Sequence, residues 1–307
     1  MVYYMVDFYK KAKMAFLIAT EPARLVSEIL HLQKVMPKLL ATAPKGDGHP
    51  VLVIPGFLAT DAYTGTMRGI LDKIGYKTYG WENGVNAGLT EEKIQRLYDR
   101  VEQISKENGG QKVSIIGWSL GGIEAHVMAH EMPEMIRDII TLGSPFGISN
   151  HPDATPKVLV DAIQWLNEKE YTLKAPSMPE RMLTPAPGVP TTSIYSKTDG
   201  IAGWHACLNP ESTLSENIEV EDAGHLNFVV NPRVIGVIAD RLAQKEGQWH
   251  PFDCQRCKAP ENPNFQLDED NTFLKNVPLD QRKVGTEPSK PTSPNNSGHH
   301  HPAAPPK

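Results

Sequence analysis

Near the middle of the chain, one short segment has the residue types and the spacing of a nucleophilic site. It reads G-x-S-x-G over Gly117–Gly121, and it follows the largely apolar run Val113–Ile116. Such a run is typical of a strand buried on both faces, and residues 123–131 predict a helix. Strand, G-x-S-x-G and helix form the layout of a nucleophile elbow, in which a sharp turn lifts the serine hydroxyl clear of the sheet. The segment therefore predicts Ser119 as a nucleophile.

A serine hydroxyl is a poor nucleophile at neutral pH, so it needs a histidine base whose tautomer is fixed by a carboxylate. On a sheet with such an elbow, the chain order is serine, then acid, then histidine. Asp199 and His225 satisfy this order, and each of them follows a predicted strand. We therefore predict Asp199 as the acid and His225 as the base of Ser119.

The oxyanion of an acyl-transfer intermediate needs two backbone N–H donors. The amide of Leu120 would lie at the N-terminus of the helix after the serine and is predicted to supply one. The second donor is expected from the loop after the first strand, where Gly56 lets the backbone come close. The amide of Phe57 is the candidate there, with that of Leu58 as the fallback.

Other histidines and aspartates are weaker candidates for these roles. Asp138 lies at the amino end of its predicted strand, which is the wrong end of a parallel sheet, and Asp222 is a weaker rival of Asp199. His205 is expected to line the pocket rather than to act as the base. The remaining competitors are expected in packing or surface positions or inside an insertion, and they are His126, His130 and His151.

The elements that must position these residues alternate between strands and helices. Strands are predicted at 51–54, 76–81, 113–116, 136–142, 191–195 and 217–220. Helices are predicted at 66–74, 90–108, 123–131 and 232–243. This alternation predicts an α/β fold, with a mostly parallel sheet of about six strands and helices on both faces. In such sheets function collects at the carboxyl ends of the strands, where the candidate residues fall.

Three segments lie outside this alternation. An N-terminal helical extension (1–45) precedes the α/β domain (46–250), and the domain contains an insertion at about 148–190 that is typical of a lid or cap. The tail (251–307) is rich in Pro, Asn, Lys and Ser and is predicted to be disordered. The extension is expected to pack on the domain, although lysines at positions 10, 11 and 13 favour peripheral contact with a membrane.

Composition narrows the functional classes. A formal net charge of −5 argues against nucleic-acid binding as the main function, and no run approaches the ~18 apolar residues of a membrane span. Three cysteines make no disulfide framework and suit a reducing compartment, so a cytoplasmic location is expected. Cys254 and Cys257 form only half of a zinc site, and their default reading is as free thiols. No metal or organic cofactor is expected.

Several of these motifs together resemble the α/β-hydrolase superfamily, and more narrowly its bacterial lipase and esterase branch. The resemblance covers roughly residues 51–243, and it rests on GWSLGG at 117–122, PGF at 55–57, TLGSPF at 141–146, KTDGIAGW at 197–204 and GH at 224–225. The sequence departs from the pattern in two ways. Pro55 replaces the histidine commonly found before the oxyanion glycine, and the first two strands of the full fold are absent.

This resemblance implies a carboxylic ester hydrolase that works through an acyl-enzyme, with Ser119, Asp199 and His225 as triad and Phe57 and Leu120 as oxyanion donors. An apolar lining is expected to favour esters with apolar acyl or aryl groups. The expected lining residues are Leu58, Trp118, Phe146, Ile201 and Trp204. Acyl transfer to an alcohol, thioester hydrolysis on the same triad, and a non-catalytic binding role are the alternatives.

Overall fold

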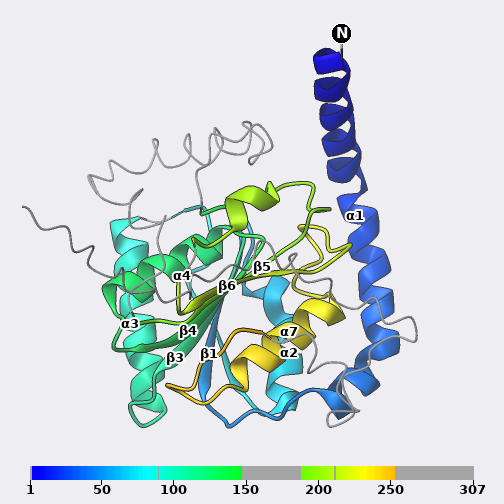
Figure 1. Cartoon of the computed structure of the whole chain (residues 1–307). Coiled ribbons are helices and arrows are strands. Elements are labelled where there is room, and N and C mark those ends of the chain that lie inside the picture. Colours follow the sequence, from blue (N-terminus) through cyan, green and yellow to red (C-terminus); the bar gives the residue numbers. More distant parts are fainter. Residues whose placement is uncertain (1, 89, 147–187, 211, 253–307) are drawn as a thin grey trace, which may run out of the picture.

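A single parallel sheet forms the centre of the computed structural model, which describes residues 2–88, 90–146, 188–210 and 212–252 (Figure 1). Its strands are β1 (Pro50–Ile54), β2 (Lys77–Gly80), β3 (Val113–Trp118), β4 (Ile136–Leu142), β5 (Thr191–Tyr195) and β6 (Ser215–Glu219). They lie in the order β2-β1-β3-β4-β5-β6, and every neighbouring pair is parallel. The strand order reverses between β1 and β3, and ligands of open α/β sheets bind beyond the carboxyl ends at such a point.

Helices cover both faces of the sheet (Figure 1). They are α1 (Val2–Thr42), α2 (Asp61–Ile74), α3 (Glu91–Glu107), α4 (Leu120–Glu131) and α7 (Pro232–Leu242), with a short 3₁₀ turn η1 (Trp204–Cys207). Residues of α1, α2 and α7 form one core layer with Val51 and Val53 of β1. Residues of α3 and α4 form the other layer with Leu52 and Ile54. Each central strand is therefore buried on both faces, which explains its continuous apolar run.

This parallel six-strand sheet, with helices on both faces and a serine turn between β3 and α4, is an α/β-hydrolase fold, and the part of the chain that the structure describes lacks the first two strands of the full form. The predicted fold class is confirmed. Three strands match the predicted runs closely, namely β1, β4 and β5. Thr90 caps α3 as the sequence indicates, because its hydroxyl accepts a hydrogen bond from the Lys93 amide.

Several element boundaries predicted from the sequence are wrong. Helix α4 begins at Leu120 instead of residue 123, and strand β3 runs to Trp118 instead of ending at residue 116. Helix α2 begins at Asp61 instead of residue 66, and the Asp61 carboxylate in its first turn accepts hydrogen bonds from the amides of Trp81 and Glu82. Strand β6 begins at Ser215 instead of residue 217. Its first residues are polar because β6 is an edge strand, where Glu216 accepts a hydrogen bond from the Thr192 hydroxyl of β5.

The N-terminal extension is one helix, α1, whose first turns project beyond the domain (Figure 1). Its C-terminal half packs on the domain through buried Leu32 and Leu39. None of the described helices is long and apolar enough to cross a membrane. The predicted lid falls largely on residues 147–187 and the predicted tail on residues 253–307, and both lie outside the described residues, as do His151, Cys254 and Cys257.

Candidate active site

Ser119, His225 and Asp199 come together at the carboxyl end of the sheet. His225 Nε2 lies 2.9 Å from Ser119 Oγ, and His225 Nδ1 lies 2.7 Å from Asp199 Oδ2. All three side chains are buried, with residue exposures of 8% for Ser119, 4% for Asp199 and 3% for His225. The loops after β3, β5 and β6 supply one member each. The three residues singled out in the sequence thus form one continuous hydrogen-bonded relay.

Backbone geometry at Ser119 is that of an elbow. The residue has φ 54°, a positive value that a serine adopts only under steric strain, and it stands directly before α4. Gly117 and Gly121 allow the tight turn, since a Cβ on Gly117 would lie 2.3 Å from the carbonyl oxygen of Gly121. A Cβ on Gly121 would lie 2.4 Å from the carbonyl oxygen of Ile54 in β1. Both glycines are needed because the backbone itself fills the space.

The carboxylate of Asp199 is held by its own loop. Its Oδ1 atom accepts hydrogen bonds from the amides of Ile201 and Ala202, both at 2.7 Å, which leaves Oδ2 for His225. Gly143, after β4, lets this pair approach the sheet, since a Cβ there would lie 2.9 Å from Asp199 Oδ2. The orientation of this carboxylate is therefore fixed by its own backbone.

The His225 loop is held by side chains from three separate elements. The indole N–H of Trp118 in β3 donates to the His225 carbonyl at 3.0 Å, and the hydroxyl of Tyr63 in α2 donates to the Leu226 carbonyl at 2.8 Å. These two rings also stack, with their centroids 4.6 Å apart. Glu21 of α1 accepts hydrogen bonds from the amides of both His225 and Leu226. Sequence reasoning missed both Tyr63, which follows the PGF motif by six residues, and Glu21, which lies far from every motif in the chain.

The loop that carries Phe57 comes close to Ser119, and Leu120 follows Ser119 directly in the chain. Gly56 brings the Phe57 loop close, because a Cβ there would lie 3.1 Å from Ser119 Cβ. Among the described residues, neither amide has a hydrogen-bond acceptor. The Leu58 amide, by contrast, already donates to the Asn86 carbonyl at 2.7 Å. Within the described residues, the backbone N–H groups of Phe57 and Leu120 therefore remain available as hydrogen-bond donors.

Asn86, which sequence reasoning also missed, clamps the loop that carries Phe57. Its amide donates to the carbonyl of Ala59 at 2.9 Å, and its side-chain Nδ2 donates to the carbonyl of Pro55 and to Glu124 Oε2, both at 2.8 Å. This residue stands in a loop of ordinary polar composition, and its type alone gives no signal of the clamp.

Two ionisable groups on α4 lie buried beneath the elbow. Burial raises the pKa of Glu124 to about 8, against the opposing hydrogen bond from Asn86, so this acid is protonated at neutral pH. Burial lowers the pKa of His126 to about 3, so this imidazole is neutral and packs against Phe146 with ring centroids 4.4 Å apart. Both groups are therefore uncharged near pH 7.

The five residues predicted to line the pocket occupy different environments. Leu58 is 61% exposed beside the Phe57 loop, whereas Trp118 and Phe146 are buried at 4% and 1%. Ile201 and Trp204 are partly buried on the Asp199 loop and η1, where the Trp204 ring contacts the His205 ring with the two planes tilted by 30°. Leu58, Ile201 and Trp204 therefore offer apolar surface near the site, while Trp118 and Phe146 belong to the packing around it.

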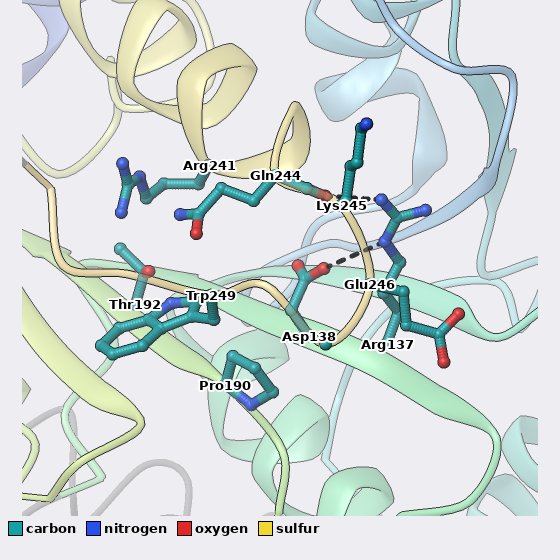
Figure 2. Close-up of a pocket in the computed structure, with 10 residues that line it drawn as sticks. Arg137, Asp138, Pro190, Thr192, Arg241, Gln244, Lys245, Glu246 and Trp249 are labelled. Atoms are coloured by element: carbon teal, nitrogen blue, oxygen red, sulfur yellow. Dashed lines mark hydrogen bonds and ion pairs between the residues drawn. The ribbon is translucent and has the colours of Figure 1, made fainter.

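A small cavity lies at the opposite end of the sheet (Figure 2). Its volume is about 20 Å³, and its walls include Asp138, at the start of β4, and Thr192 of β5. Trp249 and Gln244, from the segment after α7, complete these walls. A cavity of this size holds about one water molecule. Asp138 is separated from Ser119 by the length of the strands.

No family model matches the chain. Solved structures with a similar fold include an α/β-hydrolase enzyme from a metagenome of lagoon sediments at Mar Chica, Morocco, at 18% identity and a TM-score of 0.45, covering 64% of this chain and 90% of that one. A monoacylglycerol lipase of Paleococcus ferrophilus is 15% identical with a TM-score of 0.47, covering 66% and 96%. An esterase from Exiguobacterium antarcticum is 15% identical with a TM-score of 0.47, covering 65% and 93%. At these identities the similarity concerns the fold alone.

Proposed function

We propose that the protein is a serine hydrolase of carboxylic esters that works through an acyl-enzyme. One observation carries the proposal, the relay from Asp199 Oδ2 through His225 to Ser119 Oγ, with hydrogen-bond distances of 2.7 and 2.9 Å. The relay ends on a serine at φ 54°, and strained backbone of this kind persists where the surrounding structure over-determines it, often at functional sites. A serine, a histidine base and an orienting carboxylate in this arrangement perform acyl transfer on several unrelated folds.

In the first half of the reaction, Ser119 Oγ attacks the carbonyl carbon of the ester while His225 Nε2 takes the hydroxyl proton. The electron pair of the carbonyl bond moves onto its oxygen, and the amides of Phe57 and Leu120 stabilise that oxyanion. When the intermediate collapses, the bond to the alcohol oxygen breaks and His225 gives its proton to this leaving group. The alcohol departs, and the acyl group remains on Ser119.

In the second half, His225 takes a proton from water as the water oxygen attacks the acyl carbon. The second oxyanion forms in the same place and collapses, the bond to Ser119 Oγ breaks, and Oγ recovers the proton from His225. The product is the carboxylic acid, and the serine is regenerated. Asp199 stays ionised throughout, holds the proton of His225 on Nδ1, and stabilises the imidazolium.

The proposed substrates are small esters with an apolar acyl or aryl group. Support comes from apolar side chains on the two loops that flank the relay. Leu58 is 61% exposed next to the Phe57 loop, and Ile201 and Trp204 are partly buried beside Asp199. An apolar group of the ester would remove this surface from water, which stabilises the complex by about 25 cal/mol per Å².

The test is a series of p-nitrophenyl esters from acetate to palmitate, assayed with the wild type and with Ser119→Ala. We expect turnover that Ser119→Ala loses, together with covalent labelling of the wild-type serine by a fluorophosphonate. The acyl length at the maximum of kcat/KM distinguishes an esterase from a lipase. Added short alcohols test the alternative acceptor, since an acyltransferase would form the new ester faster than the acid.

Two results would overturn the proposal. One is a folded wild type that neither hydrolyses any ester of the series nor reacts with the fluorophosphonate, which would favour a binding role. The other is activity that survives in Ser119→Ala, which would place the chemistry elsewhere. A thioester substrate in the same series shows whether a thiol leaving group is preferred over an alcohol.

A further inference from the structure

Glu21 of α1 is a buried carboxylate that joins the two loops carrying Asp199 and His225. Only 2% of the residue is exposed. Its Oε1 atom accepts hydrogen bonds from the amides of Gly200 and His225, both at 2.9 Å, and Oε2 accepts one from Leu226 at 3.0 Å. The acceptor lies 204 positions before His225 in the chain. One side chain thus ties the acid loop to the histidine loop.

Arg24, one helical turn further along α1, completes the connection. Its Nη2 atom donates to Glu21 Oε1 at 2.6 Å, and its Nη1 atom donates to the carbonyl of Thr198 at 2.9 Å. The charge of the buried carboxylate is therefore compensated by an arginine that itself holds the acid loop. Buried carboxylates are tolerated when they are paired and fully hydrogen-bonded in this way.

Two glycines in these loops make room for α1. A Cβ on Gly200 would lie 2.6 Å from the backbone carbon of Leu17, and a Cβ on Gly224 would lie 2.6 Å from Glu21 Oε2. Neither glycine has a positive φ, so each is explained by the close approach of α1 and its side chains rather than by its own backbone conformation. Both loops, the one with Gly200 and the one with Gly224, therefore pack directly against α1.

From these contacts we infer that Glu21 is a positioning residue of the proposed hydrolase, and that α1 is part of the active-site architecture. The carboxylate fixes the backbone on either side of the Asp199–His225 hydrogen bond, so that the imidazole reaches Ser119 Oγ. This inference rests on the proposed function. It predicts that a residue of the N-terminal extension controls kcat although it lies outside the α/β domain.

The hydrogen bonds around the side chain of Glu21 require a group that only accepts, as a carboxylate does. Its two oxygens accept three backbone N–H bonds and one from Arg24, and all of these partners are donors. In Glu21→Gln the side-chain NH₂ would face one of these donors, so the amide of Leu226 or those of Gly200 and His225 would lose their acceptor. A displacement of about 1 Å at the reacting groups can lower the rate about 100-fold.

The charge of Glu21 would have an effect on His225 that the hydrogen bonds of Glu21 to the loops would not have by themselves. The charged and titratable groups around the His225 loop include Asp199, Glu21 and Arg24, Tyr63 from α2, and Glu221 and Asp222 within the loop itself. Burial, with added repulsion from Glu21, raises the pKa of Tyr63 to about 12, so Tyr63 stays neutral over the working range. Removing the negative charge of Glu21 would disfavour the imidazolium form of His225, and removing the positive charge of Arg24 would favour it.

The experiment compares the wild type with Glu21→Gln, Arg24→Gln and the control Lys34→Gln, which removes a charge from an exposed position of the same helix. We expect Glu21→Gln to lower kcat about 100-fold with KM changed less than about threefold. The acidic limb of its kcat/KM profile shifts to lower pH, and that of Arg24→Gln shifts to higher pH. Lys34→Gln keeps both the rate and the profile.

Hydrogen exchange supplies a readout that does not depend on ester hydrolysis. In the wild type the amides of Gly200, His225 and Leu226 should exchange as slowly as those of the central strands, and Glu21→Gln should accelerate these three selectively. If Glu21→Gln does not fold, Gly224→Ala provides a second variant. It keeps the charge, and its methyl group would push the carboxylate away from the loop, so kcat should fall while the fold is retained.

The outcomes separate the two proposals. Fast exchange of these amides in the wild type, or a wild-type kcat and an unshifted pH profile in Glu21→Gln, would overturn the role of Glu21. If the wild type shows no ester hydrolysis and no fluorophosphonate labelling, the proposed function fails instead. In that case the exchange data still decide whether Glu21 holds the two loops.

Discussion

Two serines mark the ends of strand β3. Ser114 lies near its start and Ser119 directly follows its last residue, and each of them lies close to a histidine and at least one carboxylate. At the carboxyl end, Ser119 meets His225 and Asp199. At the amino end, Ser114 Oγ lies 3.0 Å from His49 Nε2 and donates to Asp138 Oδ2 at 2.8 Å, and His49 Nδ1 contacts Asp47. The residue types are the same at both ends, so the types alone do not make a nucleophile.

The backbone distinguishes the two serines. Ser114 lies within the strand, paired with Val51 on one side and Asp138 on the other, and it is fully buried. Ser119 lies beyond the ladder at φ 54° and begins a helix, next to amides that have no acceptor among the described residues. A hydroxyl reacts when the chain around it leaves room and donors for a substrate. Ser114 has neither.

The electrostatic settings also differ. Burial, with help from nearby Arg137, lowers the pKa of His49, and burial raises the pKa of Asp138. Partial burial opposes ionisation of Asp47, yet its hydrogen bonds with His49 hold its pKa down at about 2. The amino-end group thus satisfies buried polar atoms around the start of β1, β3 and β4. Its role is structural.

Replacing the two serines in turn gives the largest expected contrast. Ser119→Ala should lower kcat by about 10⁴-fold or more, because the nucleophile is lost. Ser114→Ala should change kcat less than about threefold, yet it should lower the free energy of unfolding by about 1–3 kcal/mol, because His49 and Asp138 lose a buried partner. Ester hydrolysis and urea unfolding measure the two effects. A folded Ser114→Ala protein without activity would refute this reading of the two ends.

The carboxylates provide the second contrast. Asp199→Asn should lower kcat about 10³- to 10⁴-fold, because the asparagine NH₂ can no longer hold the proton of His225 on Nδ1. Asp47→Asn should leave kcat near the wild-type value and cost less than about 1 kcal/mol, because its side chain is 53% exposed. Kinetics at pH 7 and thermal unfolding check both. Equal losses of activity in the two variants would contradict the distinction.

Changes that disturb the Phe57 loop, the proposed source of one oxyanion donor, should lower kcat less than changes in the proposed triad. Asn86→Ala removes the clamp on Pro55 while keeping the amide of Phe57, so we expect kcat to fall about 10- to 100-fold with little change in KM. Asn108→Ala is the matched control, since Asn108 also makes side-chain hydrogen bonds, to Tyr79 and Ile104, at the end of α3 away from Ser119. A normal kcat in Asn86→Ala would show that the loop holds its shape without the clamp.

Local signals made much of this architecture predictable. The elbow needs glycines at fixed offsets, and central strands need continuous apolar runs, so Ser119 and the bounds of β4 and β5 could be inferred from neighbouring residues. Chain order then selected Asp199 and His225 as candidates, and the structure brings them to the serine. Such features depend on a few adjacent positions, which a sequence displays directly.

Contacts across long sequence separations were not predictable in the same way. A glutamate in a helix is usually solvated, and nothing near Glu21 indicates loops that lie about 200 residues later. The burial of Glu21, though not its partners, could have been inferred, because Glu21 falls on the same face of the helix as the buried Leu32 and Leu39. The start of strand β6 was predicted two residues too far along the chain for a related reason. The polar residues that open it resemble a turn until the edge position is known.

The last comparison concerns stability rather than rate, and it involves the buried acids at the two ends, Glu124 under the elbow and Asp138 beside Ser114. The folded protein holds the proton of Glu124 up to about pH 8, whereas the unfolded chain releases it near pH 4.3. Stability from this group is therefore complete below pH 4 and declines as the pH rises to about 8, by on the order of 5 kcal/mol. Glu124→Gln, which mimics the protonated acid, removes this decline.

Urea unfolding at pH 5 and pH 9 measures this difference. We expect Glu124→Gln to exceed the wild type by about 1 kcal/mol at pH 5 and by much more at pH 9, while the exposed control Glu102→Gln follows the wild type at both. Asp138→Asn should shift stability in the same direction, because burial raises the pKa of Asp138 as well, and it should leave ester hydrolysis unchanged. A Glu124→Gln protein less stable than the wild type at pH 9 would mean that the acid is ionised in the fold and that its charge, rather than its proton, supports the oxyanion loop.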